Sequence, residues 1–364
     1  MEWKEVRLGD ILNFRRGHDL PHSAMKPGNI PVAGSNGVIG YHDTATPIKP
    51  ILTIGRSGNV GKPYFYEEAW AHNTTLYVDD FKGNDPKFLY YLCQTMPFAN
   101  FGGGSAVPTL NRNHIHPLET KIPVKVEDQR RIASILSSLD RKIELNNKIN
   151  ADLEEMAQAI FKNWFVDFEP FKDGKFVDSE LGMIPEGWKV GNLGDFCNVF
   201  TGKKNTNQAI EKGLYPFFSC APEPLASNDA IFNGKAIIIA GNGSYTGRTS
   251  FYNGGFDLYQ RTYACTIREQ DKENLMIFFY HMMKQFFEPT KMGGTRGSSI
   301  PYIVMGDITQ QKFPYSKDWL IRFSNIANSM MDRKLRIDKE NSRLSLLRDT
   351  LLPRLMSGEL EVPE

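Results

Sequence analysis

The stretch WKEVRLGDILNFRRG, Trp3 to Gly17, returns later in the chain as WKVGNLGDFCNVFTG, Trp188 to Gly202. The second copy lies 185 residues after the first. An internal repeat of this kind indicates two similar structural units. The length of 364 residues also exceeds the size at which one hydrophobic core usually stops growing. Among the matched positions are Trp3, Leu8, Gly9, Asp10, Asn13 and Gly17, which correspond to Trp188, Leu193, Gly194, Asp195, Asn198 and Gly202.

The repeat extends over almost the whole chain. The loop IGRSGNVGKP, residues 54–63, is matched by AGNGSYTGR, residues 240–248, and each follows an apolar run that is typical of a strand. This alignment matches Gly55, Gly61 and Lys62 with Gly241, Gly247 and Arg248. Further matches are GGGSAVP at 102–108 with GGTRGSSIP at 293–301, and LDRKIEL at 139–145 with MDRKLRI at 331–337.

Each copy of the repeat has a globular part and a long helix. Residues 1–126 (copy 1) and 187–318 (copy 2) are rich in Gly, Pro, Asn and short β-branched or aromatic runs, which predicts mixed α/β globules. Apolar residues at 3-4 spacing predict helices over 127–165 and 319–352, the first about 58 Å long. Pro353 is expected to end or kink the second helix.

A narrow apolar stripe on a long helix needs a partner helix, and the simplest partner is the other copy's helix. The expected fold class is therefore α+β: two similar α/β domains separated by two long helices that form an antiparallel intramolecular coiled coil, related by a pseudo-two-fold axis. Asn146 and Asn341 interrupt the stripes, either to set helix register or as solvated edge positions. The expected domains are 1–126, 127–170 (central helical region), 171–186 (connector), 187–318 and 319–364 (C-terminal helical region).

Composition excludes several classes of protein. Apolar and charged fractions of 41% and 23% are ordinary for a globular chain. The four cysteines show no paired spacing, so neither a zinc site nor a disulfide framework is expected. The most apolar stretch, 275–287, is too short to cross a membrane, and the charged N-terminus does not resemble a signal peptide, which favours the cytoplasm. A net charge of +1 means that any DNA-binding charge must be local.

The loop at 54–63 is not a nucleotide-binding P-loop, and no other catalytic motif is present. Arg56 stands at the first glycine position of the P-loop pattern, and Pro63 stands where a hydroxyl residue should hold magnesium. His114 and His116 are the most metal-like pair, but copy 2 has no equivalent, so we expect packed or DNA-contacting histidines and no metal.

Polar and basic loop residues recur at similar places in both copies. Arg, Lys, Asn and Gln side chains read base edges, whereas Ser, Lys and loop amides position phosphates. The alternative is that these are ordinary solvated loops. The candidate DNA-binding residues are Arg15, Arg16, His18, Arg56, Ser57, Asn59, Lys62, Arg112 and Asn113 in copy 1, and Lys203, Lys204, Asn242, Ser244, Tyr245, Arg248 and Arg296 in copy 2.

Within the glycine loop, the shared and divergent residues suggest different roles. Shared glycines permit positive φ and close backbone approach, and Lys62 or Arg248 would meet a DNA phosphate. Between the glycines the copies differ, RSGNV against NGSYT, and these positions would read different bases. Exchanging them should alter base preference at one half-site only.

Several segments in order resemble the specificity subunit (HsdS) of type I restriction-modification systems. They are WKEVRLGDI at 3–11, EDQRRIASILSSLDRKIELN at 127–146, AIFKNWFVDFEPF at 159–171, LGMIPEGWKVGNLGD at 181–195 and LLPRLMSGEL at 351–360. Copy 2 departs from the pattern, since DWLIRFSNIANSMMDRK at 318–334 lacks the EDQRRIASIL wording.

The resemblance implies a non-catalytic subunit whose two recognition domains each read one half of a bipartite, asymmetric site on double-stranded DNA. It also implies docking of two methyltransferase subunits (HsdM), which use S-adenosylmethionine, and of ATP- and Mg-dependent restriction subunits (HsdR), with no cofactor in this chain. Phe161, Trp164, Phe165 and Phe168 form a plausible docking surface or, alternatively, a buried junction. The competing functions are a coiled-coil interaction scaffold, an undetected enzyme, and a DNA-binding regulator without methyltransferase partners.

Overall fold

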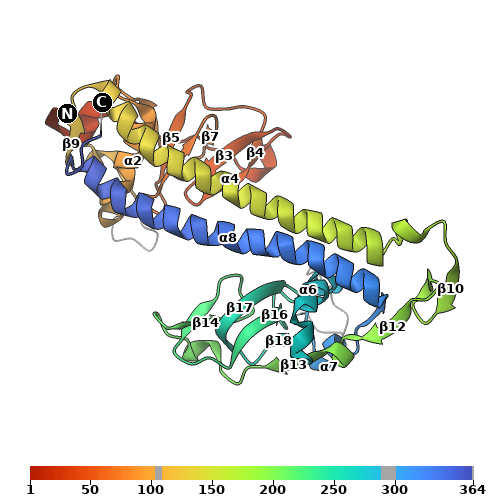
Figure 1. The fold of residues 1–364 in the computed structure, drawn as a ribbon. Coiled ribbons are helices and arrows are strands. Elements are labelled where there is room, and N and C mark those ends of the chain that lie inside the picture. Colours follow the sequence, from red (N-terminus) through yellow and green to blue (C-terminus); the bar gives the residue numbers. More distant parts are fainter. Residues whose placement is uncertain (103–108, 288–300, 363–364) are drawn as a thin grey trace. The chain divides into compact units, whose positions relative to one another are not determined.

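The computed structural model describes residues 1–102, 109–287 and 301–362, and it confirms the predicted repeat of two α/β globules with two long helices (Figure 1). Contacts between Cα atoms divide the chain into unit 1, residues 1–146 and 339–364, and unit 2, residues 147–338. Each unit contains one copy of the globule with a part of each long helix. This division cuts through both long helices, whereas the domains predicted from the sequence keep each helix whole.

The repeated stretch WK…LGD…G forms the same strand–turn–strand element in both units. In unit 1 it is β1 (Trp3–Arg7), α1 (Leu8–Ile11) and β2 (Asn13–Arg16); in unit 2 it is β12 (Lys189–Asn192), α5 (Leu193–Phe196) and β13 (Cys197–Thr201). The carboxylates of Asp10 and Asp195 each accept a hydrogen bond from a backbone N–H three residues earlier, at 3.2 Å. An aspartate recurs in LGD because it caps this helical turn.

The glycine that ends the repeated stretch is required by close backbone approach. A Cβ atom placed on Gly17 would lie 2.1 Å from the carbonyl oxygen of His72, and one on Gly202 would lie 1.8 Å from that of Leu258. Both distances are far below van der Waals contact, so only glycine fits where β2 and β13 leave their sheets.

The described residues of copy 1, which leave out 103–108, form three sheets. Strands β1 and β9 (Glu119–Pro123) pair antiparallel and close the globule just before the long helix. A four-stranded sheet has the order β2-β8-β5-β6, and a three-stranded sheet has the order β4-β3-β7. The remaining bounds are β3 (Ile30–Gly34), β4 (Gly37–His42), β5 (Ile51–Gly55), β6 (Pro63–Tyr66), β7 (Trp70–Ala71), β8 (Thr75–Asp80), α2 (Pro86–Thr95) and α3 (Arg112–Ile115).

Copy 2 repeats this plan with one larger sheet. Strand β12 pairs with β19 (Lys312–Tyr315), as β1 pairs with β9, and six strands follow the order β13-β18-β16-β17-β14-β15. The hairpin of β10 (Phe176–Ser179) and β11 (Gly182–Pro185) precedes it. The other bounds are β14 (Tyr215–Phe218), β15 (Leu225–Ser227), β16 (Phe232–Ala240), β17 (Thr249–Leu258), β18 (Thr262–Ile267), α6 (Met276–Phe286) and α7 (Met305–Thr309). Short 3-10 turns lie at 22–24, 98–101, 169–171, 206–208 and 270–275.

The two long helices, α4 (Val126–Phe165) and α8 (Lys317–Met356), each contain 40 residues and pair antiparallel within the chain, as predicted. In unit 1 the Asn146 amide donates to Glu340 at 2.9 Å and to Asn341 at 2.8 Å. In unit 2 the Asn150 amide donates to Asp338 at 2.6 Å. Since Asn146 is buried, its contact with Asn341 favours the register interpretation over a solvated edge.

Pro353 does not end α8, which corrects one of the two outcomes expected from the sequence, an end or a kink. The helix continues to Met356, and the Pro353 carbonyl accepts a hydrogen bond from the Ser357 N–H at 3.0 Å. A proline removes one N–H donor from a helix wherever it stands, and in α8 only the last turn follows Pro353.

Helix α4 is fixed to copy 1 by a buried glutamine near its start. The side chain of Gln129 accepts a hydrogen bond from the Asp85 N–H at 2.9 Å and donates to Asn84 at 2.9 Å and to the Pro123 carbonyl at 3.1 Å. At the equivalent place in α8, three residues after the first helical residue, stands the buried Leu320. Copy 2, which lacks the EDQRR segment, therefore has an apolar side chain at this junction.

A partly buried carboxylate, Glu154, joins α4 to α6 and α8 in unit 2. It accepts hydrogen bonds from the Tyr280 hydroxyl at 2.6 Å and from Lys284 at 2.8 Å, and Lys334 lies 3.4 Å away. Burial alone would raise the pKa of this carboxyl, but the two hydrogen bonds and the two ammonium charges outweigh burial and lower the pKa to about 2.

This carboxylate should make the stability of unit 2 depend on pH. The folded pKa of about 2 lies below the ordinary 4.5, so the stabilisation is complete above pH 4.5 and is lost as the pH falls towards 2. The substitution Glu154→Gln removes this pH-dependent stabilisation. The difference in unfolding free energy between wild type and variant should therefore shrink by about 3 kcal/mol from pH 7 to pH 2. Urea titrations of both proteins across this range measure it; a difference that does not change with pH would contradict the assignment.

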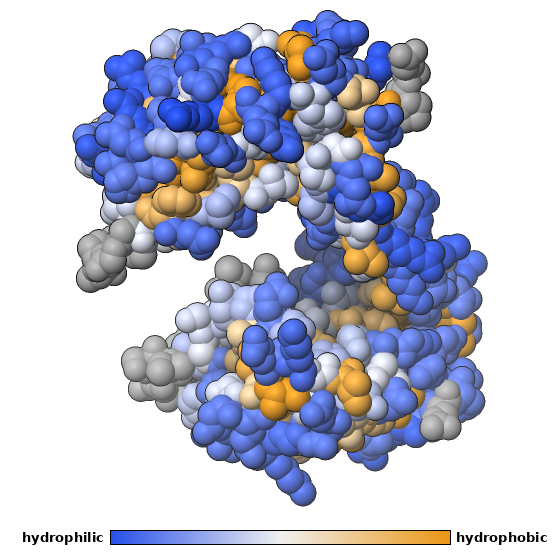
Figure 2. All heavy atoms as spheres, turned by 90° about the vertical axis from the view of Figure 1, so that its left-hand side faces the viewer, coloured by the Kyte–Doolittle hydropathy of each residue, from blue (hydrophilic) through white to orange (hydrophobic). Residues whose placement is uncertain are grey.

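Hydrophilic side chains predominate on the face drawn in Figure 2, with hydrophobic residues in small scattered groups. Within the described residues, no helix combines the length and the apolar character that crossing a membrane requires.

Candidate nucleic-acid interface

The glycine loop of copy 1 is a tight hairpin turn between β5 and β6. The Gly61 N–H donates to the Gly55 carbonyl at 2.7 Å, and the Gly55 N–H donates to the Lys62 carbonyl at 3.1 Å. Gly61 has φ of +80°, a conformation that L side chains rarely adopt. The backbone alone therefore closes the loop, so closure does not depend on the side chains of Arg56, Ser57 and Asn59.

Copy 2 closes its loop with the same two hydrogen bonds, but the alignment differs by one residue from the sequence prediction. The Gly247 N–H donates to the Ala240 carbonyl at 2.8 Å, and the Ala240 N–H donates to the Arg248 carbonyl at 2.9 Å. Gly61 thus matches Gly247 as predicted, whereas Gly55 matches Ala240 and not Gly241. The loop of copy 2 is one residue longer than that of copy 1. The alignment of the two copies by sequence gave both loops the same length and so missed this extra residue.

Four arginines from three separate segments line one hollow of about 420 Å³ in unit 1. Arg15 and Arg16 come from β2, Arg56 from the glycine loop, and Arg112 from the first residue of α3. The sequence predicted all four as candidates, and the fold brings them together. The other lining residues, which sequence reasoning missed, are Leu76, Thr109, Leu110 and Asn111.

Three of these arginines have a partner within the protein. The Arg15 guanidinium lies 3.8 Å from Asp79, and that of Arg16 lies 3.6 Å from Asp19. The side chains of Arg15 and Arg16 are 62% and 56% exposed, so a ligand phosphate can replace these carboxylates. Arg112 donates to the Phe14 carbonyl at 3.2 Å. Sequence reasoning missed both carboxylates: Asp79 lies on β8, the strand beside β2, whereas Asp19 lies only three residues after Arg16.

The other copy 1 candidates occupy varied places. His18 is half-buried, and its ring centroid lies 5.5 Å from that of Trp70 and 5.6 Å from that of Tyr77. Its side chain therefore packs on these rings and does not extend fully into solvent. Asn59, Lys62 and Asn113 are exposed, and Ser57 is half-buried. Lys62 lies over the Tyr64 ring at 5.4 Å from its centroid.

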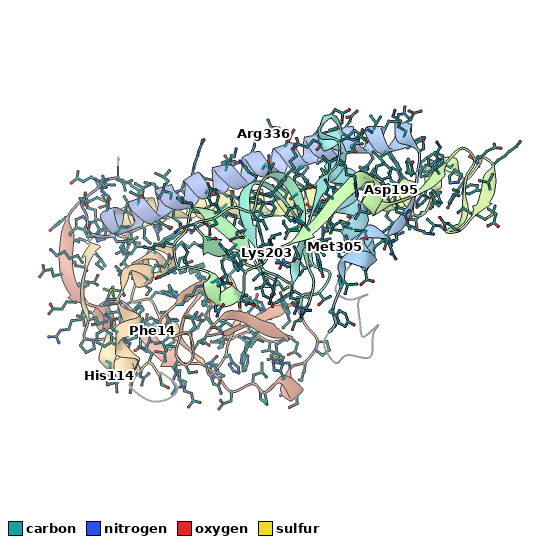
Figure 3. All side chains as sticks on the ribbon, turned by 90° about the horizontal axis from the view of Figure 1, so that it is seen from below. Phe14, His114, Asp195, Lys203, Met305 and Arg336 are labelled. Carbon is teal, nitrogen blue, oxygen red and sulfur yellow. The ribbon has the colours of Figure 1, made fainter. Side chains whose placement is uncertain are left out.

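The two histidines near α3 do not form a shared site. His114 is exposed on α3 (Figure 3), whereas the His116 ring accepts a hydrogen bond from the Phe14 N–H at 3.1 Å. Burial lowers the pKa of His116, with a further contribution from the charges of Arg112 and Lys82. Across residues 1–102, 109–287 and 301–362, no group of three or more His, Cys, Asp or Glu side chains is placed to hold a metal ion.

Two basic candidates of copy 2, Lys204 and Arg248, make close contacts within the protein, and their role in contacting DNA stays a prediction. Lys204 lies 2.7 Å from both Asp229 and Asp257, and these hydrogen bonds raise its pKa. The Arg248 guanidinium donates to the backbone carbonyls of Ala221 and Pro222. These contacts connect each cation to a neighbouring loop of copy 2.

The remaining candidates of copy 2 lie around its glycine loop. Lys203 is exposed (Figure 3), as are Ser244 and Tyr245 at the loop tip, and Asn242 is half-buried and accepts a hydrogen bond from Cys220 at 3.0 Å. Arg296 lies outside the described residues, as do Thr295 and Ser298.

The aromatic run after residue 160 lies mainly inside unit 2, which corrects part of the docking prediction. Phe161 and Phe165 are buried among Phe278 and Phe323, so neither side chain is accessible to a partner. Trp164 and Phe168 are half-buried and keep some exposed surface, although they pack on Trp319 and Trp188 respectively.

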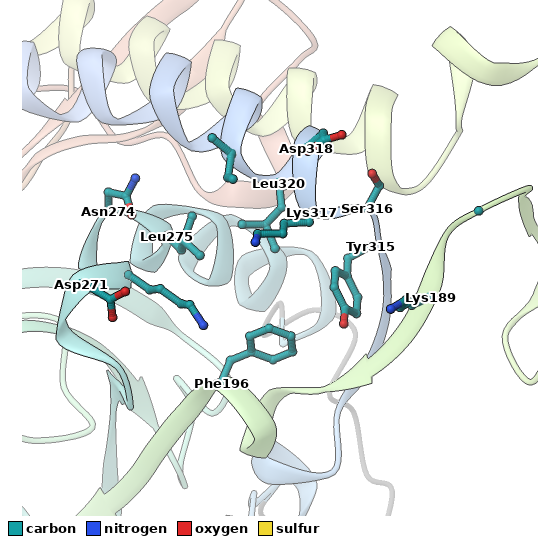
Figure 4. A pocket seen from close by; sticks show the side chains of 13 residues that line it. Lys189, Phe196, Asp271, Asn274, Leu275, Tyr315, Ser316, Lys317, Asp318 and Leu320 are labelled. Atoms are coloured by element: carbon teal, nitrogen blue, oxygen red, sulfur yellow. The ribbon is translucent and has the colours of Figure 1, made fainter.

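Unit 2 also has a larger hollow, of about 620 Å³, beside the start of α8 (Figure 4). Phe196, Leu275 and Tyr315 form its apolar floor, and Lys189 and Asp318 stand at its edge. Its lysines and aspartates show no arrangement of a nucleophile with a base, and we assign it no chemistry.

Comparison with known proteins identifies the family. The sequence model described as "Type I restriction modification DNA specificity domain" matches residues 1–155 and again residues 185–317. The chain belongs to this family. Its two matched segments each contain one copy of the globule, and membership assigns the chain to DNA specificity in type I restriction-modification.

Relatives in the family support this over most of the chain. The type I restriction enzyme MjaIX specificity subunit of Methanocaldococcus jannaschii is 29% identical over 303 residues, which cover 76% of this chain and 70% of the relative. The HindI specificity subunit of Haemophilus influenzae is 24% identical and covers 98% of this chain and 94% of the relative. A crystal structure of the type I system S subunit from M. genitalium has the same fold, with a TM-score of 0.64, 17% identity, and coverage of 98% of this chain and 96% of that one.

Proposed function

We propose that the chain is the non-catalytic recognition subunit of a type I restriction-modification complex, in which each copy binds one half of a bipartite, asymmetric DNA site. The observation that carries this proposal is the hollow of copy 1, where three segments that are distant in sequence deliver four guanidinium groups to one place. Guanidinium groups bind phosphates and the guanine edge through paired hydrogen bonds, which makes DNA the ligand that suits such a surface.

The exposed apolar residues of the long helices support a docking role for these helices. Leu346 is 69% exposed in unit 1, and Met156 is 53% exposed in unit 2. Large apolar side chains on the outer face of a helix are suited to cover by a partner protein. We therefore assign methyltransferase docking to the helices, with Trp164 and Phe168 at their border, and two methyltransferase subunits as the expected number.

The chemistry of modification and cleavage belongs to the partners in this proposal. The methyltransferase subunits would use S-adenosylmethionine, and the restriction subunits would use ATP and Mg²⁺. This chain would hold no cofactor and would act in the cytoplasm, where the DNA is. The contribution of this chain would be to determine the DNA sequence at which the partner subunits act.

Methylation mapping tests the proposal directly. The chain is expressed with the methyltransferase subunit of its own operon in a methylation-free host, and methylated adenines are mapped across the genome. We expect a split motif with a fixed gap. Exchanging residues 1–126 for another recognition domain should change one half of the motif, and exchanging residues 187–318 should change the other.

A soluble complex that leaves the genome unmethylated would contradict a recognition role and would favour a regulator. Methylation by the purified chain alone would contradict a non-catalytic subunit. Association with other proteins without any DNA binding would favour an interaction scaffold.

A further inference from the structure

Arg56 differs from the other three arginines of the hollow. Among the residues that the structure describes, its guanidinium has no hydrogen-bond or ion-pair partner, although the side chain is half-buried. Its backbone is held on both sides, since the N–H donates to the Thr74 carbonyl at 2.8 Å and the carbonyl accepts from the Leu110 N–H at 2.7 Å. The structure thus presents an uncommitted guanidinium on a fixed backbone.

The hydrogen bonds of copy 2 identify the residue at the equivalent place. There the Gly241 N–H donates to the Arg261 carbonyl at 2.9 Å, and the Gly241 carbonyl accepts from the Ile303 N–H at 2.8 Å. These two bonds match those of Arg56. A glycine therefore stands in copy 2 where copy 1 has Arg56.

No side chain can be added at this place in copy 2. A Cβ atom on Gly241 would lie 2.4 Å from the Arg261 carbonyl oxygen and 2.6 Å from the Tyr263 ring. Tyr263 occupies the strand position that Leu76 holds in copy 1, and its hydroxyl donates to the Ile303 carbonyl at 3.1 Å. The aromatic ring fills the space that the Arg56 side chain uses.

The other three arginines of the hollow also lack a basic counterpart in copy 2. Strand register aligns Arg15 and Arg16 with Phe200 and Thr201. Arg112 is the first residue of α3, and the first residue of α7, its counterpart in copy 2, is Met305 (Figure 3). The two globules thus share these backbone hydrogen bonds and strand positions and differ in the chemistry at four equivalent places.

We infer that Arg56 reads a guanine within the half-site of copy 1, and that copy 2 makes no such contact at the equivalent place; this rests on the proposed function. The guanidinium fork matches the O6 and N7 acceptors of guanine in the major groove. Arg15, Arg16 and Arg112 already interact with carboxylates or a carbonyl and hold phosphates, which fixes the globule on the duplex without reading sequence.

The test uses the full chain purified with its methyltransferase subunit and a randomised duplex library. Sequencing of the bound fraction should show a split motif with a guanine in one half. Replacing this guanine by 7-deazaguanine keeps base pairing and removes only the N7 acceptor. The wild-type complex should then bind about tenfold more weakly, since a bidentate contact of this kind gives such discrimination.

The variant Arg56→Met keeps an aliphatic side chain of similar length and removes the guanidinium group. It should lose the preference for guanine at that position, bind guanine and 7-deazaguanine duplexes equally, and retain the other half of the motif. Arg16→Ala is the matched control, because loss of a phosphate contact weakens binding to every sequence alike and leaves both halves unchanged.

Several outcomes would overturn the inference. If the wild-type complex binds guanine and 7-deazaguanine duplexes with equal affinity, the inference is wrong. This comparison needs no substituted protein, so misfolding of a variant cannot affect it. A guanine preference that persists in a folded Arg56→Met protein overturns it as well. A wild-type complex that enriches no sequence would overturn the proposed function itself, which is distinguishable from a split motif that lacks the guanine dependence.

Discussion

Replacing Phe165→Ala is expected to lower the free energy of unfolding of unit 2 by about 3–5 kcal/mol. Phe165 ends α4, and its ring centroid lies 4.9 Å from that of Phe278, 5.6 Å from Trp188 and 5.7 Å from Phe323. These rings come from α6, from the residue before β12, and from α8. Truncation leaves a cavity that four separate segments would have to close together, so little relaxation is expected.

Urea unfolding followed by circular dichroism measures this effect. Phe286→Ala is the matched control, since the same atoms are removed from a residue of α6 that is 37% exposed and that costs less to truncate. A Phe165→Ala protein within about 1 kcal/mol of the wild type would contradict the central role of this ring.

The triple replacement of Arg15, Arg16 and Arg112 by alanine is expected to weaken DNA binding by the full chain about 100-fold near physiological salt. Three cations leave the hollow, and each neutralised phosphate contributes about 0.9 to the slope of log affinity against log salt. The slope should therefore decrease in magnitude by about 2.7. Binding titrations at several salt concentrations, with the same duplex for variant and wild type, measure both quantities.

A charge-matched control separates local contacts from net charge. Arg333, Lys339 and Arg343 are exposed on α8, outside the hollow, and their replacement by alanine changes the net charge equally. This control should keep most of the affinity and of the salt slope. Equal losses in both triple variants would show that the hollow has no special part in binding DNA.

The architecture could be predicted from sequence because local signals and the repeat agreed. Helix α4 was predicted over 127–165 and spans 126–165, since its 3-4 pattern is uninterrupted by Pro or Gly. The LGD turn was visible because its capping contact lies only three residues apart, between Asp10 and Arg7. Where a structure depends on neighbours within one or two turns, residue order is sufficient to predict it.

The candidate site was predicted only in part, because its outcome depends on distant partners. Nothing near Lys204 in sequence shows that Asp229 and Asp257 will neutralise it, and Arg248 is held by carbonyls more than 20 residues earlier. The burial of Phe165 likewise follows from segments more than 20 residues away. By contrast, Arg56 was identified correctly as part of a loop, but only the fold shows that its guanidinium has no partner among the described residues.

The ion pairs of Arg15 with Asp79 and of Arg16 with Asp19 bear on how quickly the protein finds its target. A protein searching a genome spends most of its time on wrong sequences, and each stop lasts longer when more cations engage phosphates. Here two cations remain with their own carboxylates until DNA displaces these, and the whole chain has a net charge of only +1. We therefore expect stops on wrong sequences to be short, and residence to become long only where base contacts are added.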